Sequence, residues 1–167
     1  MRRSLSVVSL LLLLLSSALM VAEIASGLLK ADDLKKVVPA TYFFRGQLAA
    51  VQLRNSAGFS AGGKLVLAGL VDTGGYSTDV QAKYQGFLIT EVKLNVGGTE
   101  LAPGEYGFGF SSKEGKFTVL NVASEEVIRV DTQTESDLKR PMPLTMKADG
   151  DNYKLYSGRQ WVSLKAE

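Results

Sequence analysis

The side chains that could carry chemistry in this sequence are carboxylates and aromatic rings. The 167 residues include no cysteine and no histidine. Without histidine, the chain lacks the usual general base near neutral pH and the commonest transition-metal ligand. Without cysteine, it has no thiol nucleophile and no disulfide framework. Composition therefore excludes a Ser-His-Asp triad, a Cys-His dyad and a histidine-based zinc site, and we expect no cofactor.

One carboxylate, Asp72, lies in a motif with a recognised chemistry. Leu70–Gly74 has the order hydrophobic-hydrophobic-Asp-Thr-Gly, which resembles the signature of aspartic proteases. In that chemistry two carboxylates, one from each copy of the motif, share a proton. This chain has one copy, so catalysis would need a retropepsin-like homodimer. Gly75 stands where Ala or Ser is usual, and Asp-Thr-Gly-Gly is also a common turn after a strand. We expect no catalytic residue, with Asp72 as the one candidate.

Acidic residues gather in three loops that could be considered for calcium. Asp72 and Asp79 flank the first loop, residues 131–137 hold three acids, and Asp149–Asn152 forms the third. Calcium needs six or more oxygens from a defined loop. None of these segments has the EF-hand spacing, because Gly150 separates two acids instead of following three ligands. We expect solvated turns and no metal site.

Aromatic residues alternate with glycines in one segment. After a turn predicted at Pro103-Gly104, residues 106–110 read Tyr-Gly-Phe-Gly-Phe, which places rings on one face of a strand and glycines on the other. Strand glycines allow another backbone or side chain to approach closely. The rings are expected to pack in a core, and around a cavity they would instead bind a ligand. The candidate ligand-binding residues are all aromatic: Tyr84, Phe87, Tyr106, Phe108 and Phe110.

The elements that must position these residues are short β-strands. From Thr41 onward, about ten apolar or alternating runs are separated by turn-forming residues. Lys64–Val71 is apolar on both faces, which predicts a central strand buried on both sides. Asn55–Gly58 has the composition of a turn, and residues 111–116 predict a hairpin turn. The sequence predicts an all-β fold: a single antiparallel sandwich or a closed barrel, since both show the same alternation.

Residues 1–22 have the features of a signal peptide. Arg2 and Arg3 precede a leucine-rich apolar core, and small residues follow. Cleavage is expected after Ala18 or Ala22, and an uncleaved membrane anchor is the alternative. The sequence therefore predicts a periplasmic or secreted protein that keeps no stable membrane span once the leader is removed.

A short lead-in separates this leader from the β domain, which we place at residues 41–167. Residues 23–40 predict one or two helical turns that Ser26 or Asp32 could cap and Pro39 ends.

Charge gives little indication of a partner. Lysine and arginine number 19 against 17 acids, and removal of Arg2 and Arg3 would leave the two equal. No long basic run is present, so we expect no nucleic-acid binding. The partner is expected to be a protein or a small molecule of unknown identity.

Three segments, VVPATYFFRGQ, LAPGEYGFGF and YKLYSGRQWVSL, resemble small exported bacterial proteins of unknown function. The Leu-x-Pro-Gly-x-Tyr element is similar to hairpins of secreted β-sandwich domains, most of which are binding or accessory modules. The resemblance implies an exported, non-enzymatic binding or structural module and carries over no functional residue. Two alternatives stay open: a calycin-like barrel that holds a small apolar ligand between the aromatic candidates, and a dimeric aspartic protease that uses Asp72.

Overall fold

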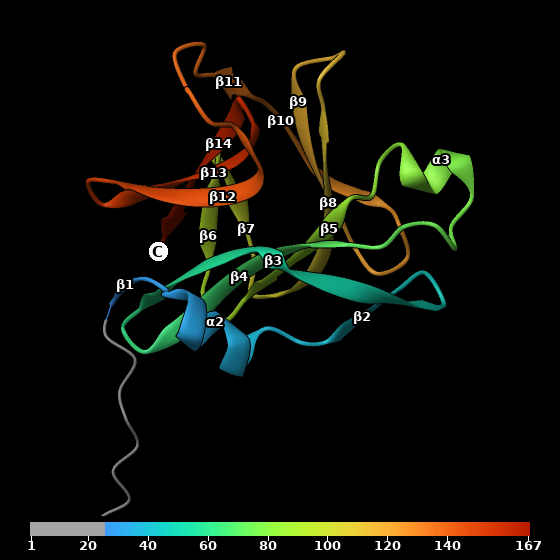
Figure 1. The fold of residues 1–167 in the computed structure, drawn as a ribbon, viewed down its shortest axis with the longest axis horizontal. Helices are drawn as coiled ribbons and strands as arrows, with labels where there is room; N and C mark the ends of the chain where they lie inside the picture. The colour runs from blue at the N-terminus through green and yellow to red at the C-terminus, as the bar shows by residue number, and fades with distance from the viewer. Residues whose placement is uncertain (1–25) are drawn as a thin grey trace, which may run out of the picture.

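A computed structural model of the chain describes residues 26–167 (Figure 1). The predicted signal peptide, residues 1–22, lies outside the described residues. In the described part of the chain, no helix has the length and apolar character needed to cross a membrane.

The larger of two sheets has eight strands, and every strand is antiparallel to its neighbours. Its order is β1-β3-β4-β5-β8-β9-β10, and β2 pairs with the first part of β3. The strands are β1 (Gly27–Leu28), β2 (Thr41–Phe44), β3 (Gln47–Ala61), β4 (Lys64–Val71), β5 (Gly86–Thr90), β8 (Gly104–Ser111), β9 (Lys116–Leu120) and β10 (Glu126–Asp131).

The smaller sheet has six strands in the order β12-β13-β14-β6-β7, and β11 also pairs with β14. In Figure 1 it packs against one side of the large sheet, with β12 crossing over β3. Its strands are β6 (Leu94–Val96), β7 (Thr99–Leu101), β11 (Gln133–Thr134), β12 (Met142–Asp149), β13 (Asn152–Gly158) and β14 (Gln160–Ala166).

The two sheets form a sandwich, which confirms the first of the two predicted architectures. The sheets do not close into a barrel, because strand pairing within residues 26–167 stays inside each sheet. The described strands number fourteen instead of about ten. The difference comes from pieces such as β1, β7 and β11, which have two or three residues and are too short to show alternation.

β3 corrects one sequence prediction. Asn55–Gly58, expected to form a turn, lies inside this strand. The pairing of β3 with β4 shifts between Val51 and Ser56, so an irregularity in the ladder accommodates the polar residues. Gly58 lets the two strands approach, because a Cβ there would lie 2.6 Å from the carbonyl oxygen of Val66.

The helical lead-in is confirmed, but its predicted caps are wrong. Helix α2 (Ala31–Val37) begins after Lys30, which provides no side-chain cap. The hydroxyl of Ser26 instead accepts the N–H of Gly62, and Asp32 pairs with Lys35 inside the first turns at 3.0 Å. A second short helix, α3 (Thr78–Gln81), lies at the end of the predicted polar loop and was not expected.

Each face of the large sheet buries its own apolar cluster. Core 1 lies between the two sheets, and core 2 lies on the outer face of the large sheet, under α2, β2 and the segment that contains α3. β4 contributes Val66 to core 1 and Leu67 to core 2, which confirms that this strand is buried on both sides. The main members of core 1 are Phe59, Val66, Leu88, Phe108, Phe117, Leu155 and Leu164; those of core 2 are Leu34, Tyr42, Phe44, Leu67, Tyr76, Tyr84, Phe87 and Leu120.

On the core 2 face of the large sheet, aromatic rings pack directly against glycines. The strand register sets Gly69, Phe87 and Gly107 side by side on β4, β5 and β8. A Cβ at Gly107 would lie 2.7 Å from the Phe44 ring and 2.9 Å from the Tyr84 ring. The close approach predicted for the strand glycines is therefore confirmed.

Candidate functional site

Asp72 has a structural role in the turn that follows β4. Its carboxylate is exposed, and one oxygen accepts the N–H of Gly74 at 3.0 Å. This bond closes an Asx turn, the arrangement that Asp favours at such positions. Tyr76 then anchors the loop, since its hydroxyl lies 3.1 Å from the carbonyl oxygen of Phe44 and 3.3 Å from that of Gln47. The Asp-Thr-Gly-Gly-Tyr segment thus covers core 2.

The five aromatic candidates lie on two opposite faces of the large sheet. Phe108 and Phe110 are buried in core 1, with Tyr106 at its border, whereas Tyr84 and Phe87 are buried in core 2. The β-sheet between them prevents the two groups from lining one cavity. Each group packs against further rings instead, as shown by the centroid distances of 5.7 Å for Phe108–Phe117 and 3.9 Å for Phe44–Tyr84.

Three tyrosine hydroxyls lie in core 2. Tyr42 donates to the carbonyl oxygen of Tyr106 at 3.2 Å, and Tyr76 is bound as described above. The hydroxyl of Tyr84 is buried and has no hydrogen-bond partner among residues 26–167. Burial, reinforced by the neighbouring phenols, raises the pKa of Tyr84 well above its usual value; burial also raises the pKa of Tyr42. These phenols are therefore neutral packing groups at physiological pH.

The acidic loops do not converge on a metal site. Across residues 26–167, no three side chains of a metal-ligating type gather in a suitable arrangement. Several of the acids pair with other groups instead. Asp131 pairs with Lys116 at 2.6 Å, and Glu135 accepts the hydroxyl of Tyr156 at 2.5 Å, a bond that lowers the pKa of Glu135.

A cleft of about 300 Å³ opens on the outer face of the large sheet, beside core 2. Its floor is formed by Gly109 on β8 and Thr118 on β9, which pair with each other, and Arg129 on β10 pairs with Thr118 at the edge of this floor. Gly109 leaves room for the chain above it, because the backbone carbonyl of Lys83 occupies the position that a side chain would take. We call this site the charged cleft.

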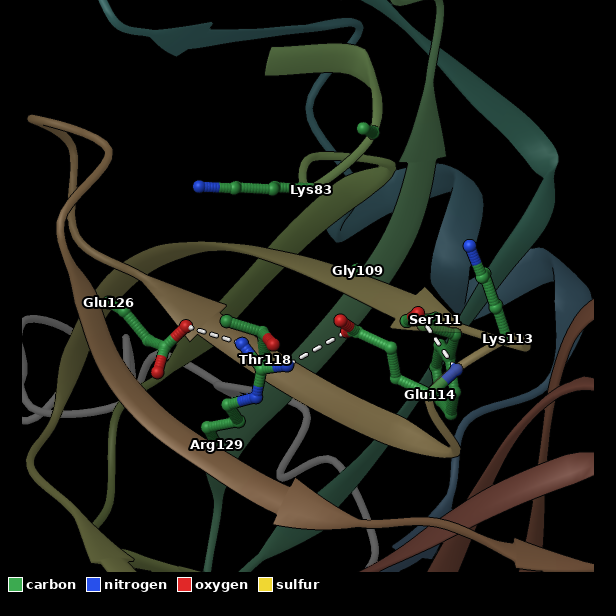
Figure 2. A pocket seen from close by; sticks show the side chains of 10 residues that line it. Lys83, Gly109, Ser111, Lys113, Glu114, Thr118, Glu126 and Arg129 are labelled. Atoms are coloured by element: carbon green, nitrogen blue, oxygen red, sulfur yellow. Dashed lines mark hydrogen bonds and ion pairs between the residues drawn. The ribbon is translucent and has the colours of Figure 1, made fainter. Parts of the chain in front are cut away.

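Charged side chains surround the floor (Figure 2). Lys83 lies on one side, and Arg129 lies on the other, where it pairs with Glu114 at 2.8 Å and with Glu126 at 3.4 Å. Lys113 projects from the turn between β8 and β9. Neither lysine side chain makes an ion pair or a hydrogen bond with any residue in the described range. The cleft thus contains three cationic groups and two carboxylates, and two of the cations are free.

Gln85 fixes the position of the chain segment that carries Lys83 on one side of the charged cleft. Its carboxamide donates to the carbonyl oxygen of Phe110 and accepts the N–H of the same residue, both at 3.0 Å. Its own backbone N–H bonds to the carbonyl oxygen of Phe108 at 2.8 Å. Gln85 therefore continues the pairing of β5 with β8 by one residue, and Lys83 stays above the cleft.

The comparisons with protein-family models, characterised proteins and solved structures found no match for this chain. The geometry of the described residues therefore carries the functional argument.

Sequence reasoning did not find the charged cleft. Lys83, Lys113 and Arg129 come from three separate segments, and the strand register brings them together. One signal could have indicated the cleft: a small residue, Gly109, lies in register with outward-facing polar residues on the next two strands. This arrangement can be recognised only when the register of the strands is known.

Proposed function

We propose that the protein is an exported, non-enzymatic binding module and that its charged cleft receives an anionic ligand. The observation that carries the proposal is the pair of ammonium groups, on Lys83 and Lys113, that have no partner within residues 26–167 and lie beside a cleft with a glycine in its floor. The leader pattern supports export, and the structural role of Asp72 in its turn supports a function other than catalysis.

The charges of the cleft indicate which chemical groups its ligand carries. Arg129 is already neutralised by Glu114 and Glu126, so it shapes the wall and leaves the two lysines to attract an anion. Ser111 and Thr118 add hydroxyl groups to the lining. Two separated cations favour a ligand with at least two acidic groups, because each charge-assisted hydrogen bond is stronger than a neutral one. We therefore assign the ligand to the class of phosphate- or carboxylate-bearing small molecules and chains.

Calorimetric titration with inorganic tripolyphosphate tests the proposal. We expect saturable binding at low salt that weakens as salt is added, because exposed charges are screened. Lys83→Gln and Lys113→Gln should each lower the affinity by about three- to tenfold, the range expected for a charge-assisted bond in a partly open site.

The matched control is Lys64→Gln, which removes one exposed lysine from the first position of β4; Lys64 is not among the residues that line the cleft. If this variant loses as much affinity as the cleft variants, the binding reflects net charge and the proposal is wrong. The absence of binding by the unmodified protein at low salt also contradicts it.

A further inference from the structure

A second cavity, of about 430 Å³, opens where β14 changes its neighbour. Along one side of β14, Trp161 pairs with Gln133 of β11, and Leu164 pairs with Val96 of β6. Between these pairings, at Val162, neither β11 nor β6 pairs with β14, and the N–H of Gly97, just after β6, bonds to the carbonyl oxygen of Ser163 at 2.9 Å. The volume is within the range of about 300 to 1,000 Å³ usual for small-molecule sites. We call this cavity the tryptophan groove; its lining is Gly97, Arg129, Val130, Asp131, Gln133, Trp161, Val162 and Ser163.

Neutral polar groups in the tryptophan groove have free hydrogen-bonding capacity. The indole N–H of Trp161, the carboxamide of Gln133 and the hydroxyl of Ser163 make no side-chain hydrogen bond with any residue from 26 to 167. The indole donates, the hydroxyl can donate or accept, and the carboxamide offers two donors and an acceptor. The groove therefore presents uncharged hydrogen-bond donors and uncharged acceptors.

Contacts from β13, the neighbour of β14 on the side away from the groove, hold the indole ring in place. The Lys154 ammonium lies 4.5 Å from the centroid of the Trp161 ring, and the Tyr156 ring lies 6.3 Å away. A fixed aromatic ring loses little conformational entropy when a ligand binds. Trp161 is only half-buried, so part of its surface remains available to the groove.

The two charged residues of the groove are already paired. Arg129 is bound by Glu114 and Glu126, and Asp131 is bound by Lys116 at 2.6 Å. An ion that entered would have to compete with these pairs or remain uncompensated. The groove therefore favours a neutral ligand, in contrast to the charged cleft on the other side of Arg129.

We propose that the tryptophan groove binds a neutral saccharide. A sugar ring has a C–H face that packs on an indole and hydroxyl groups that both donate and accept hydrogen bonds. These are the groups that Trp161, Gln133 and Ser163 complement. The apolar base of the groove, Val130 and Val162, excludes water from the contact. This site is independent of the charged cleft, since the two share the wall formed by Arg129 but none of the groups that would bind the ligands.

The chain contains one tryptophan, so its intrinsic fluorescence reports directly on this groove. The experiment titrates the protein with neutral oligosaccharides built from glucose, mannose, galactose, xylose or N-acetylglucosamine. We expect at least one of them to give a saturable shift of the emission and to protect Trp161 from quenching by acrylamide. Gln133→Ala and Ser163→Ala should each weaken that binding by about fivefold to tenfold, the value of one or two hydrogen bonds.

Two control variants separate this site from its surroundings. Thr134→Ala changes the next residue of β11, whose side chain points to the other face of the strand, and should leave the saccharide affinity unchanged. Lys83→Gln should also leave it unchanged, although that variant weakens the binding of tripolyphosphate. Trp161→Phe, with its fold verified by circular dichroism, should lose the saccharide binding measured by calorimetry.

Three results would overturn the assignment. One is a constant emission throughout the saccharide panel. The second is an equal loss of affinity in Thr134→Ala and Gln133→Ala. The third is an emission shift that tripolyphosphate produces and that Lys83→Gln removes, which would assign the groove to the anionic ligand.

Discussion

Replacing Gly107 with alanine tests whether the packing of the aromatic rings in core 2 requires glycines in the large sheet. The added Cβ would lie 2.7 Å from the Phe44 ring and 2.9 Å from the Tyr84 ring, closer than Cβ atoms in proteins approach other atoms. Both rings are fully buried and stacked on each other, with centroids 3.9 Å apart, so neither can move alone. Gly107 does not have a positive φ, so alanine is acceptable to the backbone and the cost is steric.

The expected cost is that of overpacking a filled core, about 2 kcal/mol of the free energy of unfolding. For a domain of this size, such a loss lowers Tm by about 4 to 8 °C. Urea and thermal unfolding followed by circular dichroism measure both quantities. The matched control is Gly75→Ala, whose Cβ would meet only the end of the flexible Gln47 side chain, at 3.1 Å. We expect this control to change the stability by less than about 0.5 kcal/mol.

A compensating substitution makes the test more specific. Phe44→Leu shortens the side chain that the new methyl group meets, so in the double variant the two losses should sum to more than the measured loss. The reasoning is refuted if Gly107→Ala is as stable as the unmodified protein, or if the two losses are simply additive.

Two further predictions concern the buried phenols. Tyr84→Phe removes a hydroxyl that has no hydrogen-bond partner among residues 26–167, so it should leave stability unchanged or raise it by up to about 1 kcal/mol. Tyr76→Phe removes a bonded hydroxyl and should cost about 1 to 2 kcal/mol; urea unfolding of both variants decides, and a larger loss in Tyr84→Phe would contradict the assignment. Burial, followed by the hydrogen bond with Glu135, raises the pKa of Tyr156 to about 12, so the folded protein keeps a proton that the unfolded chain releases near pH 10. The free energy of unfolding should therefore be constant with respect to this group below about pH 9 and should fall between about pH 10 and 12, and in Tyr156→Phe this fall should be smaller. An equal fall in Tyr156→Phe and in the unmodified protein would disprove the prediction.

The fold was largely predictable because alternation and turn residues coincide along most of the chain. Lys64–Val71 shows this directly, since a strand apolar on both faces must lie between two cores. Asn55–Gly58 shows the limit of the method. Its residues favour a turn locally, but β4 and the Val66 carbonyl hold them extended, and such tertiary pairing is not visible in composition.

The candidate sites were less predictable than the fold. The aromatic candidates were correctly expected to suit a core, yet sequence could not show that Phe87 and Phe108 face opposite ways, because this depends on how β5 pairs with β8. Lys83 and Arg129 carry no motif, and they reach the two sides of one cleft because β8, β9 and β10 pair in this register and the backbone of Lys83 lies over Gly109. Trp161 also belongs to no motif, and the cavity next to it arises from the change of partner along β14.

The position of β14 has a consequence for the order of folding. This strand follows all the other described strands in sequence, yet it lies between β13 on one side and β6 and β11 on the other. While the chain is being synthesised, β6 and β7 therefore remain without the rest of their sheet until residues 160–166 arrive. Until then, the apolar inner face of the large sheet, including Phe59 and Phe108, stays open to water and to chaperones. Joining β6 to β14 also closes a long loop, so we expect the last folding step to be slow and to complete both layers at once.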